Sequence, residues 1–257
     1  MAAIDVTYSI EGSGPPLYMV HGIGSCKEGW LELVSHLKDA FTCVIYDLRG
    51  HGESPVPTPP YTLDELVEDL EALRLKLGHK KIHVIGHSLG GMIGPAYARA
   101  YPEQTLSVGL LSTAAGRSEE DRAKLRKVGE ALDKDGLLEL LPTLVARWFS
   151  DEFLANNPDA VQWRLEQVKS TPEAVFKSVF NIYATTEMAP WLHEIKQPCL
   201  VLTGELDGGC NPRLNTFIAE QLGNSRLVIL EGLKHSILIE ASDRVAEPLR
   251  QFLLEIG

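Results

Sequence analysis

The segment Gly86-His87-Ser88-Leu89-Gly90-Gly91 places a serine between glycines, directly after the apolar run 82–85. The apolar run predicts a buried strand, and the residues that follow the segment are compatible with a helix. A sharp turn from strand to helix has no room for side chains two positions before and two positions after the serine. The pattern therefore predicts a strained turn that exposes the Ser88 hydroxyl in an open cleft, as a nucleophile elbow does.

The motif fixes only three positions, and an ordinary glycine-rich loop between a strand and a helix can also match it. A catalytic serine must therefore have its partner residues elsewhere in the chain. A serine hydroxyl needs an imidazole that takes its proton and a carboxylate that fixes the imidazole tautomer. The apolar runs 199–203 and 226–230 predict two parallel strands, and Asp207 and His235 follow them. Because both residues come just after strand ends, we expect them at the same rim of the sheet as Ser88.

Ser88, Asp207 and His235 are therefore the predicted catalytic residues, in the chain order serine, acid, histidine. Glu205 is the competing acid, but it lies two residues closer to the end of its strand and ranks second. Taken singly, a helix-capping aspartate or a solvated loop histidine is an ordinary feature. The three residues in this order favour catalysis.

A second loop is expected to stabilise negative charge. The apolar run 17–20 leads into His21-Gly22-Ile23-Gly24. Acyl transfer creates a negatively charged oxygen, which needs backbone N–H donors that already point at it. The expected donors of this oxyanion hole are the amide of Leu89, directly after the serine, and the amide of Ile23. We expect His21 to hydrogen-bond within the loop and hold its shape rather than to react.

A further motif is the segment Tyr46-Asp47-Leu48-Arg49-Gly50-His51-Gly52-Glu53-Ser54. Together with the motifs described above, it makes the chain resemble a compact member of the α/β-hydrolase superfamily over nearly its whole length. Within that superfamily, residues 46–52 and Leu111-Ser112-Thr113-Ala114-Ala115 are similar to 3-oxoadipate enol-lactonases, which open a small lactone. Those enzymes commonly carry a Ser-Asn-Ser-Leu-Gly-like loop where this chain has Val20-His21-Gly22-Ile23-Gly24. Carboxylesterases and carbon–carbon hydrolases of meta-cleavage products share the remaining motifs.

Strand and helix patterns alternate along the chain, which predicts a mainly parallel, doubly wound sheet, the core of an α/β-hydrolase fold. After the strand expected at 106–111, the sheet pattern stops for about 80 residues. We expect an inserted helical cap at residues 117–195, with residues 1–116 and 196–257 forming the core. Three or four helices are expected in the cap, near residues 119–131, 137–149, 159–169 and 172–185.

The apolar positions of the cap include several aromatic residues, which predict an apolar pocket that excludes water above Ser88. Trp148 and Trp163 are the expected substrate contacts. Their neighbours Arg147 and Arg164 are the candidates for binding an anionic lactone. Arg49 and His51, in the loop after the strand 42–46, are expected to be structural.

The composition limits the kinds of partner that we expect the protein to bind. A formal net charge of −11 over 257 residues argues against nucleic acid or an anionic membrane as a partner. The start of the chain lacks the apolar segment of a signal peptide, and no apolar run approaches about 18 residues. We therefore expect a cytoplasmic protein, monomeric or homo-oligomeric, that acts on a small molecule.

Cysteines and histidines give no pattern of a metal or cofactor site, so none is expected. The four cysteines are far apart and form no C-x-x-C motif, which favours buried free thiols over disulfides. Cys26 and Cys210 fall close to the predicted oxyanion loop and the loop of Asp207. They are candidates for the mouth of the pocket.

The sequence thus predicts a cofactor-independent serine hydrolase that cleaves a small carboxylic ester or lactone through an acyl-enzyme. One alternative is a carbon–carbon hydrolase that uses the same three residues on a meta-cleavage product. Another is a ligand receptor that keeps these residues on the same fold but barely turns over. Multiple turnover separates the enzymes from the receptor.

Overall fold

A mainly parallel sheet organises the computed structural model, which describes residues 2–256, and its strand order is β1-β3-β2-β4-β5-β6-β7. Only β1 runs antiparallel to its neighbour, β3. The strands of this described part are β1 (Tyr8–Glu11), β2 (Pro16–Val20), β3 (Thr42–Tyr46), β4 (Ile82–His87), β5 (Thr105–Leu111), β6 (Cys199–Gly204) and β7 (Ser225–Leu230). The predicted parallel strands are confirmed to within two residues at each end.

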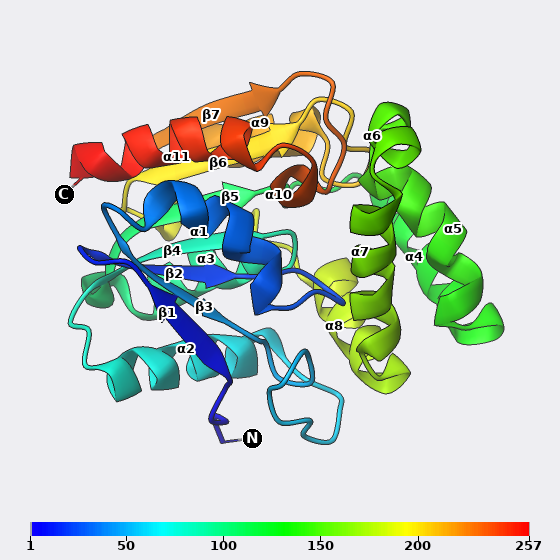
Figure 1. The fold of residues 1–257 in the computed structure, drawn as a ribbon, viewed down its shortest axis with the longest axis horizontal. Helices are drawn as coiled ribbons and strands as arrows, with labels where there is room; N and C mark the ends of the chain where they lie inside the picture. Colours follow the sequence, from blue (N-terminus) through cyan, green and yellow to red (C-terminus); the bar gives the residue numbers. More distant parts are fainter. Residues whose placement is uncertain (1, 257) are drawn as a thin grey trace.

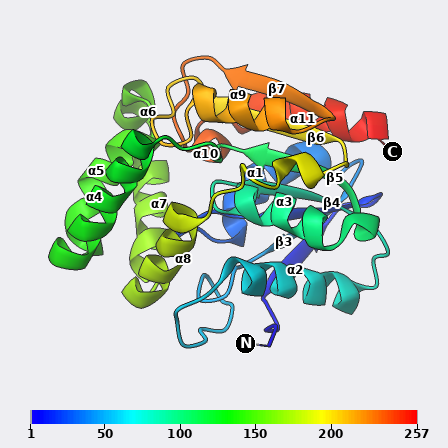
Figure 2. The same cartoon turned by 180° about the vertical axis from the view of Figure 1, so that it is seen from behind.

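Helices cover both faces of the sheet (Figures 1 and 2). One face carries α1 (Leu31–Leu37), α10 (Ile237–Glu240) and α11 (Ser242–Ile256), and the other carries α2 (Leu63–Leu77), α3 (Gly90–Ala100) and α9 (Pro212–Gln221). Short 3₁₀ turns cover Lys27–Trp30, Pro102–Gln104 and Leu192–Glu194.

The central strands are apolar on both sides because each face packs against a helical layer. In β2, Leu17 and Met19 belong to the apolar cluster under α1 and α11, whereas Tyr18 and Val20 belong to the cluster under α2 and α3. All four side chains are fully buried. The sheet is therefore the rigid layer from which the loops at its carboxyl end project.

Between β5 and β6 the chain forms a group of helices at the carboxyl end of the sheet (Figure 1). These helices are α4 (Glu119–Asp135), α5 (Leu137–Trp148), α6 (Asp151–Asn156), α7 (Pro158–Ser170) and α8 (Glu173–Thr185). The predicted helices are all present, but the short α6 was not predicted. It has six residues and none of them is buried, so it leaves no apolar periodicity in the sequence.

None of the helices in the described residues 2–256 combines the length and the apolar character that crossing a bilayer requires. The four cysteines are buried and unpaired, as the sequence predicts.

The turn between β4 and α3 forces two backbone segments close together. Ser88 has a φ of +57°, a left-handed conformation that costs energy for a residue with a side chain. A Cβ atom on Gly86 would lie 1.8 Å from the carbonyl oxygen of Gly90, and one on Gly90 would lie 2.0 Å from that of Val20. The two glycines therefore allow the turn, for the reason that the sequence indicates.

We predict that Gly86→Ala lowers the free energy of unfolding by about 3 kcal/mol, because backbone must move to admit the methyl group. Gly223→Ala is the matched control, since a Cβ atom at Gly223 meets nothing within 4 Å. Urea denaturation followed by circular dichroism measures both variants. Equal stability of the two variants would contradict this account of the turn.

Candidate active site

A cavity of about 160 Å³ opens at the carboxyl end of the sheet, beneath the inserted helices. The loops after β2, β4, β6 and β7 form its floor, and residues of α4, α5, α7, α8 and α10 form its other walls. Ser88, Asp207 and His235 all line this cavity. Three loops far apart in the sequence thus bring the three predicted catalytic residues to one place.

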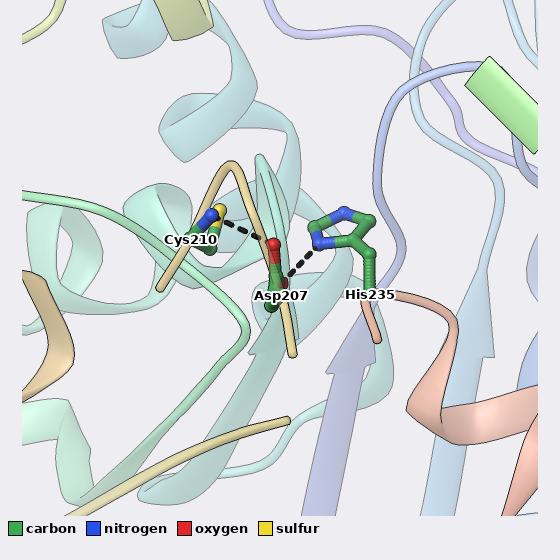
Figure 3. A group of neighbouring side chains, drawn as sticks. All are labelled: Asp207, Cys210 and His235. Carbon is green, nitrogen blue, oxygen red and sulfur yellow. Dashed lines mark hydrogen bonds and ion pairs between the residues drawn. The ribbon is translucent and has the colours of Figure 1, made fainter. Parts of the chain in front are cut away.

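Asp207 and His235 are joined by a hydrogen bond in which Nδ1–H donates to Oδ2 over 2.7 Å. The other carboxylate oxygen, Oδ1, accepts hydrogen bonds from the amides of Gly209 (2.9 Å) and Cys210 (2.8 Å). Figure 3 shows Cys210 and His235 on either side of the carboxylate. Because Nδ1 holds its proton for Asp207, neutral His235 keeps an unprotonated Nε2.

Burial and charge act in opposite directions on this pair. Burial disfavours the charged form of each group, but the attraction between the two charges and the hydrogen bond outweigh it. The pKa of His235 is consequently raised above its usual value, and the pKa of Asp207 is lowered. The arrangement stabilises an imidazolium beside a carboxylate.

His87, directly before the serine, contacts both the backbone and the ring of His235. Its Nε2–H donates to the carbonyl oxygen of His235 over 2.9 Å, and the two ring centroids are 4.9 Å apart. Burial, together with the charge of His235, lowers the pKa of His87 to about 3, so this ring stays neutral. The sequence pattern predicts no role for His87, because the motif leaves that position variable.

The backbone of Ser88 is held on both sides. Its amide donates to the carbonyl of Leu111 over 2.9 Å, and its own carbonyl accepts from the hydroxyl of Thr113 over 2.9 Å. Within residues 2–256, no hydrogen bond joins the Ser88 hydroxyl to His235. In enzymes without bound substrate such a bond is often long and shortens in the complex.

His21 braces the loop that carries Ile23, as expected from the sequence. Its Nε2 accepts from the amide of Leu48 over 2.9 Å, and its Nδ1–H donates to the carbonyl of Gly22 over 2.8 Å. Burial lowers the pKa of His21 to about 4, which keeps the ring neutral and allows one nitrogen to accept while the other donates.

His51 holds the same loop one residue further on. Its Nε2 accepts from the amide of Gly24 over 3.2 Å, and its Nδ1–H donates to the carbonyl of Arg49 over 3.1 Å. Burial, helped by the nearby His21, lowers the pKa of His51 to about 3. Arg49 in turn makes two hydrogen bonds to Asp69, of 2.7 and 2.8 Å. Arg49 and His51 therefore have the structural roles that the sequence indicates.

The amides of Ile23 and Leu89 donate no hydrogen bond to any other residue among those that the structure describes. Ile23 lies in the cavity wall, and Leu89 follows the serine directly. The peptide group that supplies the Ile23 N–H has its carbonyl at Gly22, where His21 donates a hydrogen bond. Hydrogen bonds in such a chain polarise one another, so this contact strengthens the Ile23 amide as a donor.

Arg164, on α7, connects the inserted helices to the same loop. It donates to the carbonyl of Ile23 over 3.0 Å and to that of Gly24. Its guanidinium carbon lies 4.6 Å from the centre of the Trp148 ring. Burial lowers its pKa to about 10, so the group is still charged at neutral pH. No described carboxylate forms an ion pair with it.

The structure separates the predicted substrate contacts. Trp148, Arg147 and Arg164 line the cavity, whereas Trp163 lies outside it, with 40% of its surface exposed. On α7, Arg164 lines the cavity, but its neighbour Trp163 lines a separate hollow of the surface together with Phe153 and Asn157. The predicted contact of Trp163 with the pocket is therefore not found.

The sequence pattern does not predict several other residues of the cavity wall. Cys210 lines the cavity but Cys26 does not, so only one of the two candidate cysteines reaches it. The helix α8 contributes Phe176, Phe180 and Tyr183. The apolar pattern marks these positions as buried, but it does not distinguish a core contact from a cavity wall.

Residues 15–242 match the sequence model of the family described as alpha/beta hydrolase fold. The chain is 28% identical to 3-oxoadipate enol-lactonase 2 from Acinetobacter baylyi, an alignment that covers 86% of this chain and 82% of that protein. It is also 28% identical to a proline iminopeptidase from Pestalotiopsis fici, covering 90% and 88% of the two chains.

Two solved structures extend this likeness to the fold. The enol-lactonase from Burkholderia xenovorans superposes with a TM-score of 0.90 at 25% identity, over 98% of this chain and 99% of that one. A thermophilic esterase from Thermogutta terrifontis superposes with a TM-score of 0.88 at 26% identity, over 98% and 94%. On its sequence, its sheet topology and its relatives, the chain belongs to the α/β-hydrolase fold family.

Proposed function

We propose that this hydrolase cleaves a small carboxylic ester or lactone, with Ser88 as nucleophile, His235 as general base and acid, and Asp207 as the acid that orients His235. The observation that carries the proposal is the hydrogen bond from His235 to Asp207 in the wall of the cavity that Ser88 also lines. A serine hydroxyl becomes a nucleophile when such an oriented imidazole is at hand.

The first step is attack of Ser88 Oγ on the carbonyl carbon of the substrate. The hydroxyl proton passes to Nε2 of His235, because Nδ1 is already protonated and hydrogen-bonded to Asp207. The negative Asp207 stabilises the imidazolium that forms. Its own amide donors, Gly209 and Cys210, fix the carboxylate in this orientation.

Negative charge then develops on the former carbonyl oxygen. In our proposal the amides of Ile23 and Leu89 receive it, and each such donor contributes about 3 kcal/mol to the transition state. Arg164 adds a buried positive charge behind the loop and holds two of the loop's carbonyl groups. It is a positioning residue in this scheme, since it acts through the loop.

The intermediate collapses to an acyl-enzyme when His235 returns the proton to the leaving oxygen. For a lactone, that oxygen stays attached to the acyl chain, so ring opening releases no separate alcohol. His235 then takes a proton from water, the resulting hydroxide attacks the acyl carbonyl, and Ser88 leaves with the proton. No cofactor or metal ion takes part in this sequence of steps.

The cavity and the relatives support a small, partly apolar substrate. A volume of about 160 Å³ and walls formed by Leu144, Phe176 and Phe180 fit a compact ester or lactone. Relatives bear the names of lactonases and an esterase. We assign substrate contacts to Trp148 and Arg147, and we propose that residues 117–195 act as a cap that keeps water out.

We predict that Ser88→Ala lowers the turnover of p-nitrophenyl acetate and butyrate by about 10⁵-fold or more, because the covalent route is lost. Ser25→Ala is the control, since Ser25 lines the same cavity but has no part in the mechanism. Product is followed well beyond one equivalent of enzyme. Full activity of Ser88→Ala would contradict the proposal, and a single burst that stalls in the wild type would favour the receptor.

A second prediction concerns pH. His235 must be neutral to accept a proton, and Asp207 raises its pKa, so activity should rise with pH at a value above the usual 6.5 of histidine. The Asp207→Asn variant lacks the negative charge that raises the pKa of His235. Burial of His235 then lowers this pKa.

The acidic limb of kcat/KM should therefore move to lower pH in Asp207→Asn, while kcat drops by about 10⁴-fold. Glu205→Gln, the variant of the second-ranked acid, should leave the limb in place. The pH profiles of the three proteins test the assignment, and a limb that moves with Glu205 instead of Asp207 would overturn it.

Arg164→Gln should lower kcat by about 10- to 100-fold with little change in KM for a neutral ester, a loss smaller than that of an oxyanion donor. The loop loses two of its hydrogen bonds and a nearby positive charge. Arg126→Gln, on the exposed surface of α4, is the control for a lost surface charge. Steady-state kinetics would refute the role of Arg164 if KM rose while kcat stayed the same.

A further inference from the structure

Three different metal-binding side chains meet beside the proposed catalytic histidine. The ligand atoms of Asp207, Cys210 and His235 all lie within 4.8 Å of one another (Figure 3). We propose that this cluster is a binding site for a zinc-class divalent ion, such as Zn²⁺ or Cd²⁺, and that the bound ion switches off the active site. The inhibition rests on the proposed function, whereas the binding itself does not.

The donor set suits such an ion. A thiolate, an imidazole nitrogen and a carboxylate oxygen are the ligands that zinc takes in proteins, at about 2.0–2.3 Å. In tetrahedral geometry, two such ligands are separated by about 3.3–3.7 Å. The present spacing requires the 2.7 Å contact between Asp207 and His235 to open slightly and the sulfur of Cys210 to approach.

Neighbouring groups already orient the three ligands. The amides of Gly209 and Cys210 occupy Oδ1 of Asp207, which leaves Oδ2 directed at His235. The hydroxyl of Tyr183 lies 3.2 Å from the sulfur of Cys210. Hydrogen bonds of this kind to the ligands are what metal sites use to fix their geometry.

The cavity gives an ion access to the cluster. Asp207, Cys210 and His235 all lie in its wall. A water molecule from the cavity can take the fourth position of a tetrahedral ion. Within residues 2–256, no other group of three or more such side chains has its ligand atoms gathered in this way.

Binding has a defined consequence for the protons. The ion takes the lone pair of Nδ1 on His235, so the proton that Nδ1 donated to Asp207 moves to Nε2. Cys210 binds as a thiolate, and its proton leaves to solvent, one for each ion bound when His235 starts neutral. With a proton on Nε2, His235 can no longer accept the proton of Ser88.

Binding is measured first, on the full chain carrying Ser88→Ala, so that the result does not depend on activity. Isothermal titration with cadmium chloride should give one ion per chain, together with the ultraviolet charge-transfer absorption of a cadmium thiolate. Adding Cys210→Ala should remove the absorption and weaken binding at least tenfold, as loss of a ligand requires. Cys43→Ala is the control, because Cys43 is a buried thiol within β3.

Inhibition is measured next, on the otherwise unaltered chain. Zinc chloride should stop ester hydrolysis, and EDTA should restore it. In Cys210→Ala, the zinc concentration for half inhibition, relative to that variant's own rate without metal, should rise at least tenfold.

The outcomes separate the two proposals. Cadmium bound through Cys210 in a chain that hydrolyses no ester would leave the metal site standing and overturn the proposed function. Cadmium bound equally well by Cys210→Ala, or not bound at all, would overturn the metal site, even in an active hydrolase.

Discussion

The close approach of backbone at the turn between β4 and α3 is the constraint on which the rest of the site depends. At Gly86 and Gly90, backbone carbonyl groups lie where the Cβ atom of any other residue would be. Only glycine therefore fits at these two positions. Ser88 is thereby held with a positive φ at the end of a central strand. The strain is sustained because β4 pairs on both sides with largely buried strands, β2 and β5.

Neutral histidines recur around this turn as structural braces. His21 and His51 each accept a hydrogen bond from one backbone amide and donate one to a backbone carbonyl. Burial keeps both rings uncharged. His87 donates to the backbone of His235. Four histidines thus meet near one serine, but only His235 has a carboxylate partner among the described residues, which is why its pKa moves in the opposite direction. This contrast distinguishes the proposed base from its neighbours.

Arg164 links the inserted helices to the sheet. Its guanidinium lies against Trp148 of α5 and donates to the carbonyls of Ile23 and Gly24. A movement of α7 would therefore be felt by the loop that supplies one of the proposed oxyanion donors. The cavity wall and that loop are therefore connected by the buried Arg164 and by the apolar contacts of Ile23 with the cluster that includes Val168 and Phe176.

Much of this arrangement follows from the sequence. The strands of the sheet interior and the glycines of the turn have strong local signals, and parallel strands bring Asp207, His235 and Ser88 to one rim whatever the loops do. Side-chain direction in the inserted helices carries no such signal. Trp163 and Arg164 are adjacent in the sequence, yet one is exposed and the other reaches the cavity, a difference set by how α7 packs. The short α6 has no buried face, and β1 is a four-residue edge strand without a fully buried residue, so neither shows a periodic pattern.

The most direct test of the account is covalent labelling of the full chain with a fluorophosphonate ester, followed by peptide mass spectrometry. Such reagents phosphonylate a serine only when a neighbouring base activates it. We expect one adduct per chain, located on Ser88 and lost when His235 is replaced by alanine. Absence of an adduct, or an adduct on another serine, would contradict the central claim that this turn presents an activated nucleophile.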